Sequence, residues 1–271
     1  RSSAGWRRLA RMNPKAESIN ALINQVALER RRRESVPGLH AKVAAVKHYQ
    51  QRRFTHTYND LLTSKRYGAA ARFFLDDLYG PRDFSQRDAQ FARVVPALVR
   101  LFPSEIVHTV ETLARLHALS EQLDSEMGRH VGTMDIRAFD YISAWRSTAR
   151  RADRALQIDL TLEVGAALDL YTRRPLLRHS LKLMRGPAKA AGLGELQRFL
   201  ESGFDTFKEM QGANEFLRTI AIRERALADA IFDPRTSAAD DESTTSVRTA
   251  DHAVRLLPPD AGKPLRGPSQ Q

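Results

Sequence analysis

The sequence FFLDDLYGPRDF, at residues 73–84, decides how the chain around it folds. Its apolar and aromatic side chains, which we expect to supply buried area, are Phe73, Phe74, Leu78, Tyr79 and Phe84. Gly80 can adopt the left-handed conformation that closes a helix, and Pro81 has no N–H with which to continue it. The stretch therefore predicts a helix that packs against protein on both sides and ends at a structural corner.

Asp77 shares a helix face with Phe73 and Phe74, so its carboxylate needs an arginine or a backbone N–H as a partner. The stretch resembles the signature of the bacterial FFLEELY-motif family, with Asp76-Asp77 in place of the glutamate pair. The resemblance extends over about residues 37–232 and implies a fold unit with no assigned activity. We interpret the motif as chiefly structural.

The composition limits the classes of protein to which the chain can belong. The 271 residues include no cysteine, which excludes disulfides, zinc–thiolate sites and thiol nucleophiles and favours a cytoplasmic location. A hydrophobic content of 42% is enough for an ordinary core. No apolar run approaches the ~20 residues that a membrane-spanning helix needs, so we expect no such span.

Apolar residues recur at helical spacing along most of the chain, which predicts an all-α fold, an irregular multi-helix bundle of about eight helices. Residues 156–164 alternate apolar and polar side chains as a strand does. No second alternating run can pair with them, so we expect a helix there. The predicted organisation is a basic N-terminal arm with one helix at 1–36, an all-helical domain at 37–232 and a disordered tail at 233–271.

The net charge is +11, and three groups of basic residues are candidates for binding phosphates. The groups are Arg30, Arg31, Arg32 and Arg33; Arg146, Arg150 and Arg154; and Arg174, Arg178 and Lys182. Solvated helix faces are the commoner origin of such groups. No helix-turn-helix signature or RNA-recognition aromatic pair accompanies them, so we expect any nucleic-acid binding to be weak.

Two histidine–carboxylate pairs are candidates for chemistry. Glu105 and His108 have the Glu-x-x-His spacing of metal ligands, but a di-metal bundle needs that motif twice and the chain has it once. His117 lies on an apolar helix face with Glu121 at i+4, which suits a proton relay or a metal. A hydrogen-bonded histidine at the core edge is the commoner case. We predict neither a metal nor a cofactor.

The sequence contains no nucleotide-binding or hydrolase motif, which favours a non-enzymatic interaction or regulatory module with another protein as its partner. The first alternative is a basic protein associated with nucleic acid, motivated by the charge. The second is a helical enzyme that binds a metal or a small ligand at His117 or His108. The sequence assigns no oligomeric state.

Overall fold

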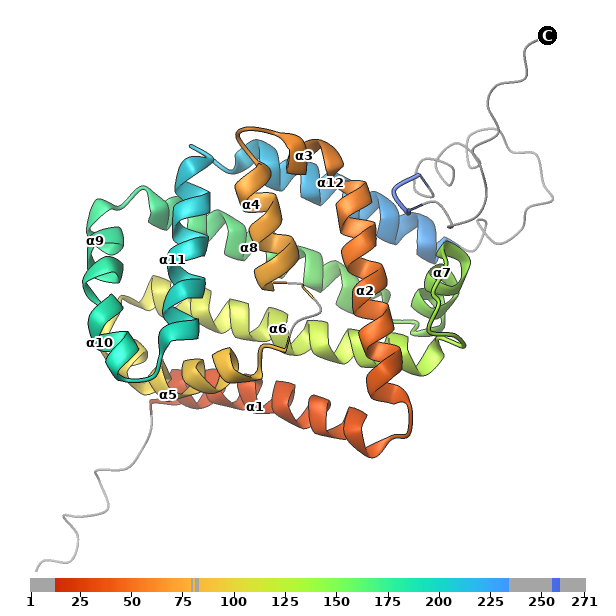
Figure 1. Cartoon of the computed structure of the whole chain (residues 1–271), viewed down its shortest axis with the longest axis horizontal. Helices are drawn as coiled ribbons and strands as arrows, with labels where there is room; N and C mark the ends of the chain where they lie inside the picture. Colours follow the sequence, from red (N-terminus) through yellow and green to blue (C-terminus); the bar gives the residue numbers. More distant parts are fainter. Residues whose placement is uncertain (1–12, 79, 81–82, 234–254, 259–271) are drawn as a thin grey trace, which may run out of the picture.

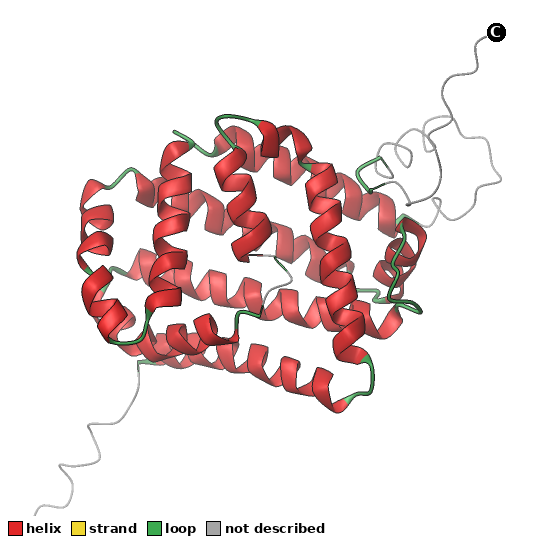
Figure 2. Cartoon of the chain, viewed as in Figure 1, coloured by secondary structure: helices red, strands yellow, loops and turns green. Residues whose placement is uncertain are grey.

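The computed structural model describes residues 13–78, 80, 83–233 and 255–258, and every regular element in these ranges is a helix (Figures 1 and 2). The first six α-helices are α1 (Pro14–Ser35), α2 (Leu39–Thr57), α3 (Asn59–Thr63), α4 (Gly68–Phe73), α5 (Ser85–Leu101) and α6 (Ser104–His130). The other six are α7 (Ala138–Ser147), α8 (Arg151–Thr172), α9 (Pro175–Leu183), α10 (Arg185–Ala190), α11 (Gly194–Glu209) and α12 (Asn214–Phe232). The all-α prediction is confirmed. None of the helices described is both long and apolar enough to cross a bilayer.

The described residues form twelve α-helices, so the predicted number of about eight was too low. One additional helix arises where a short turn divides a segment that looks continuous in the sequence: Tyr58 ends α2 and precedes α3. Met184 separates α9 from α10, close to Gly186-Pro187, a pair typical of helix ends. Residues 156–164 lie within α8, which confirms the helix expected there.

α6 is the longest helix, with 27 residues, and it lies at the centre of the fold. α1, α2 and α8 pack along it, and α8 in turn packs against α11 and α12. In Figure 1, α2, α4 and α11 cross in front of α6 and α8, so the body has two layers. Side chains are buried on more than one face of α6, as its central position requires.

The N-terminal helix is part of this body. α1 buries Ile19 and Ile23 in a cluster with Val95 of α5 and Val107 of α6. The basic segment that the sequence suggested as an arm is therefore packed into the fold over residues 14–35, because its apolar stripe faces α5 and α6. Residues 1–12 lie outside the described residues.

A short piece of the predicted C-terminal tail docks on the helices. Leu257 is only 4% exposed and packs in a cluster with Val46 and Trp145. The hydroxyl of Thr57 donates a hydrogen bond to the carbonyl of Leu256 at 2.6 Å. The rest of the tail predicted to be disordered, residues 234–254 and 259–271, lies outside the described residues.

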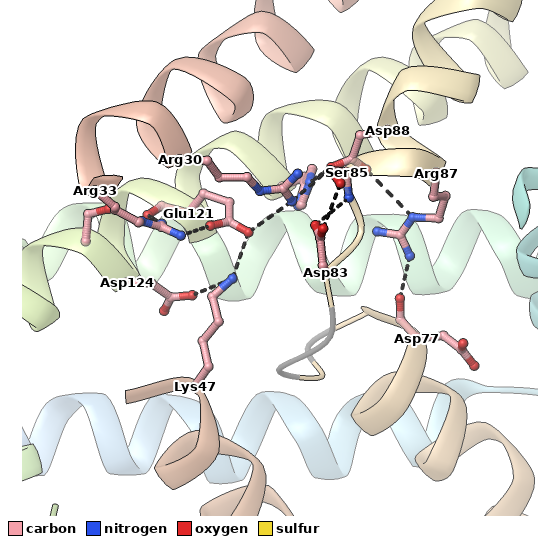
Figure 3. Close-up of polar contacts among 12 residues, drawn as sticks. Arg30, Arg33, Lys47, Asp77, Asp83, Ser85, Arg87, Asp88, Glu121 and Asp124 are labelled. Carbon is pink, nitrogen blue, oxygen red and sulfur yellow. Dashed lines mark hydrogen bonds and ion pairs between the residues drawn. The ribbon is translucent and has the colours of Figure 1, made fainter. Parts of the chain in front are cut away.

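The motif helix α4 continues into a π-helical turn, Phe74–Leu78. Glycine is needed at residue 80 for a reason other than the left-handed conformation expected from the sequence. A Cβ there would lie 2.6 Å from the carbonyl oxygen of Asp76, so only glycine lets the chain pass this close to its own helix. Arg87 donates to the carbonyl of Asp77 at 2.6 Å and ties this turn to α5 (Figure 3). Tyr79 and Pro81 lie outside the described residues.

Candidate ligand-binding cavity

A cavity of about 110 Å³ lies beside the motif, and residues from α2, α3, α4, α6, α7, α8 and α12 complete its wall. The motif supplies Phe74, Leu75, Leu78, Gly80 and Phe84. Phe73 packs elsewhere, stacked on Phe199 of α11 with ring centroids 5.5 Å apart. The motif, interpreted from the sequence as a structural corner, is thus also one wall of a cavity.

The wall beside Phe74 is aromatic and aliphatic. The ring of Phe74 lies 5.7 Å from that of Phe216, and Phe54 and Ile220 line the same cavity. These side chains present hydrocarbon surface to the cavity. This part of the wall therefore suits an apolar group.

The remaining wall is polar and charged. Its ionisable side chains include Lys47, Arg53, His117, Glu121, Asp124, Arg154 and Glu224. Arg53 and Glu224 form a buried ion pair, and the hydroxyl of Tyr58 donates to the same carboxylate at 2.6 Å. Burial, followed by the charge of Glu224, raises the pKa of Tyr58 well above its ordinary value, so the hydroxyl stays protonated and donates.

Glu121 is the centre of an ion-pair network that holds α1 and α2 against α6 (Figure 3). Its carboxylate lies 2.6 Å from Arg33 Nη1, 2.8 Å from Lys47 Nζ and 3.4 Å from Arg30 Nη2. Burial alone would raise the pKa of Glu121, but Lys47 and Arg33 outweigh burial and hold it well below its ordinary range. Glu121 is therefore a charged group whose charge is already matched by neighbouring cations.

The structure does not bring His117 and Glu121 together as a metal site. His117 Nε2 lies 2.9 Å from Asp88 Oδ2, and Asp88 also pairs with Arg30 at 3.0 Å. Burial opposes ionisation of Asp88, but the hydrogen bond from His117 and the charge of Arg30 lower its pKa. His117 is thus a hydrogen-bonded histidine beside the cavity.

The second histidine pair is on the surface. His108 Nε2 lies 3.2 Å from Glu163 Oε1, and both side chains are exposed. The main-chain carbonyl of Glu105 accepts hydrogen bonds from the hydroxyls of Thr109 and Tyr171. Within the residues that the structure describes, no three His, Cys, Asp or Glu side chains are placed to hold a metal ion.

Arg154 lies in the interior of the protein and lines the cavity. Its side chain is only 3% exposed, and its guanidinium lies 4.4 Å from the ring centroid of Trp145. Nη1 donates to Gln157 Oε1 at 3.0 Å, whereas Nε and Nη2 have no hydrogen-bond partner in the described part of the chain. Burial lowers the pKa of Arg154, because the charged form is poorly solvated there.

The other basic candidates differ in burial and in the partners that they contact. Arg33 is buried, Arg30 is half-buried, and Arg31 and Arg32 are exposed. The remaining contacts are Arg146 with the carbonyl of Ile231, Arg150 with Asp153, Arg174 over the ring of Tyr171, and Arg178 with Asp205. Lys182 is exposed. The group Arg146, Arg150 and Arg154 is thus divided between the surface and the interior.

Sequence reasoning singled out Glu121 and Arg154 but missed Arg53, Trp145 and Glu224. These three residues lie on α2, α7 and α12, and only the tertiary fold brings them to one cavity. No spacing within a single helix relates them.

The fold and the site together define an all-helical protein with an interior cavity that is apolar on one part of its wall and charged on the other. Residues 29–238 match a family model described as Domain of unknown function (DUF8198), and the chain belongs to this family. Searches of curated proteins and of solved structures returned no match.

Proposed function

We propose that this protein is a non-enzymatic regulatory module of the cytoplasm that binds a small organic molecule in the cavity beside the motif. One observation carries the proposal: the motif and a set of buried charged residues, far apart in the sequence, meet around the same cavity. A concave site with a largely apolar wall and a few convergent polar groups is typical of small-molecule binding. The lack of cysteine fits the reducing cytoplasm.

The size of the cavity suits a small ligand. Apolar protein cavities of about 150 Å³ hold a benzene molecule. The cavity of about 110 Å³ is smaller, so the ligand, or the recognised part of one, is no larger than a short chain or a single ring. The π-helical turn over Phe74–Leu78 supports this role, because such turns are frequent at functional sites.

The two alternatives have less support. For nucleic acid, Arg33 and Arg154 are buried, so neither is presented to a phosphate backbone. For a metal enzyme, the carboxylate of Glu121 is already paired with three cations. The resemblance of residues 73–84 to the FFLEELY signature stays a prediction, as does a protein partner that responds to the bound ligand.

A matched pair of substitutions on α4 tests the proposal. Ala71 lines the cavity, whereas Ala69 is on the same helix, half-buried and not part of the wall. In a thermal-shift screen of small organic acids, amines and alcohols, we expect compounds that raise the Tm of the wild type and of Ala69→Met. The longer side chain in Ala71→Met occupies the cavity and should abolish the shift. An equal shift in Ala71→Met, or no shift from any compound, contradicts the proposal.

A further inference from the structure

Four buried donor nitrogens that belong to three residues of the cavity wall have no hydrogen-bond acceptor among the described residues. They are Nε and Nη2 of Arg154, Nε1 of Trp145 and Nε of Arg53. A buried donor without an acceptor is destabilising, so such groups are few in folded proteins. Because these donors belong to residues that line one cavity, the cavity is complementary to a group that only accepts hydrogen bonds.

With Arg154 itself included, the cations near Arg154 outnumber the carboxylates near it by one. The carboxylates that act on Arg154 most strongly belong to Asp124 and Glu224. Glu224 pairs with Arg53, while Asp124 lies 3.7 Å from Lys47 and accepts a hydrogen bond from Gln50 at 3.1 Å. Glu121 keeps Arg33 as its own partner, at 2.6 Å. Each carboxylate therefore has a cation other than Arg154, and a single negative charge would balance the site.

The geometry of the guanidinium narrows the chemistry further. Nη1 is used by Gln157, and the two donors without acceptors, Nε and Nη2, form one edge of the planar group. Two parallel N–H donors on one edge match the two oxygens of a carboxylate. Trp145, which lies against the guanidinium, holds that plane in place.

We propose that the cavity binds a small organic monocarboxylate, with the carboxylate on the Nε–Nη2 edge of Arg154 and the hydrocarbon part against Phe54, Phe74 and Phe216. The inference rests on the proposed ligand-binding function and adds the class of ligand. The cavity volume of about 110 Å³ limits the hydrocarbon part to a single ring or a short chain.

Isothermal titration calorimetry of the full chain with benzoate and with benzamide, its neutral analogue of similar shape, tests the assignment. We expect wild-type protein to bind benzoate at least about 10-fold more tightly than benzamide, since hydrogen bonds between charged groups are the stronger ones. Arg154→Gln should weaken benzoate binding about 10- to 100-fold and leave benzamide binding nearly unchanged. Arg151→Gln removes the same charge from the exposed side of α8, where Arg151 pairs with Asp229, and should leave both affinities unchanged.

The outcomes separate this inference from the proposed function. If benzamide binds wild-type protein as tightly as benzoate, the cavity binds ligands but the carboxylate assignment is wrong. If neither compound binds, the carboxylate assignment is wrong, while the thermal-shift screen still decides the broader function. If Arg154→Gln fails to fold, the comparison of the two compounds on wild-type protein remains decisive, because it needs no variant.

Discussion

The ring of Phe73 lies directly on the backbone of Gly203: a Cβ added to residue 203 would be 2.8 Å from Phe73 Cζ. This contact joins α4, at the start of the motif, to α11, and the stacking of Phe73 on Phe199 extends it. The position of the motif, and therefore of the cavity wall that follows it, depends on a glycine that is 130 residues away in the sequence.

Replacing that glycine should displace the motif. We expect Gly203→Val to lower the free energy of unfolding by about 1–3 kcal/mol, because the added methyl groups overlap the Phe73 ring. Gly186→Val is the matched control, since a Cβ at residue 186 meets nothing within 4 Å. Urea denaturation of both variants measures the difference. Equal stability of the two variants would show that Phe73 moves aside without cost.

Glu121 should make the stability of the protein depend on pH. Its folded-state pKa lies below the ordinary value of 4.5, so the unfolded chain binds more protons, and stability is lost as the pH falls below that value. At pH 7 we expect Glu121→Gln to cost about 3–5 kcal/mol, because the buried Arg33 loses its partner. At pH 3.5 the difference between wild type and variant should be smaller.

Urea denaturation at the two pH values checks this expectation, with Glu209→Gln as the control. Glu209 is exposed, so its substitution should change the free energy of unfolding by no more than about 0.5 kcal/mol at either pH. The account of the network fails if Glu121→Gln is as stable as Glu209→Gln at pH 7.

The docked segment around Leu257 should contribute to stability. We expect Leu257→Ala to lower the free energy of unfolding by about 1–3 kcal/mol, less than a leucine at the centre of the core, because a short segment can detach without unfolding the rest. Leu101→Ala, at a position that is 70% exposed, should have almost no effect. Chemical denaturation of the two variants distinguishes a docked segment from one that makes no contribution.

Much of the fold could be predicted from the sequence, because helical periodicity is a local property. The apolar residues of α8 predict a helix even where residues 156–164 alternate like a strand. The number of helices could not be predicted, because nothing in the local sequence at Tyr58, where α2 ends and α3 follows, resembles a Gly-Pro break. That turn depends on the packing of the helices that flank it.

The site could be predicted only in part. Arg154 lies seven residues before the buried Thr161, two helical turns along α8, so the helical phase already places it on the buried face. The spacing of Arg146, Arg150 and Arg154 predicts the opposite, because three arginines four residues apart are typical of an exposed helix face. Nothing in the sequence relates Arg53 to Glu224, which are 171 residues apart, so the pairing that leaves Arg154 uncompensated needed the structure.

Arg154, in this account, binds a ligand and does not stabilise the fold. Arg53 and Arg154 are 2% and 3% exposed and line the same cavity, but among the residues that the structure describes only Arg53 has a carboxylate partner. The most direct measurement is the free energy of unfolding of Arg154→Met and Arg53→Met by urea denaturation at pH 7 without ligand. We expect Arg53→Met to lose about 3–5 kcal/mol, because Glu224 is left buried and unpaired. Arg154→Met should stay within about 1 kcal/mol of the wild type, or exceed it, since an apolar side chain replaces an uncompensated charge. A loss for Arg154→Met as large as that for Arg53→Met would contradict the account and make Arg154 a structural residue.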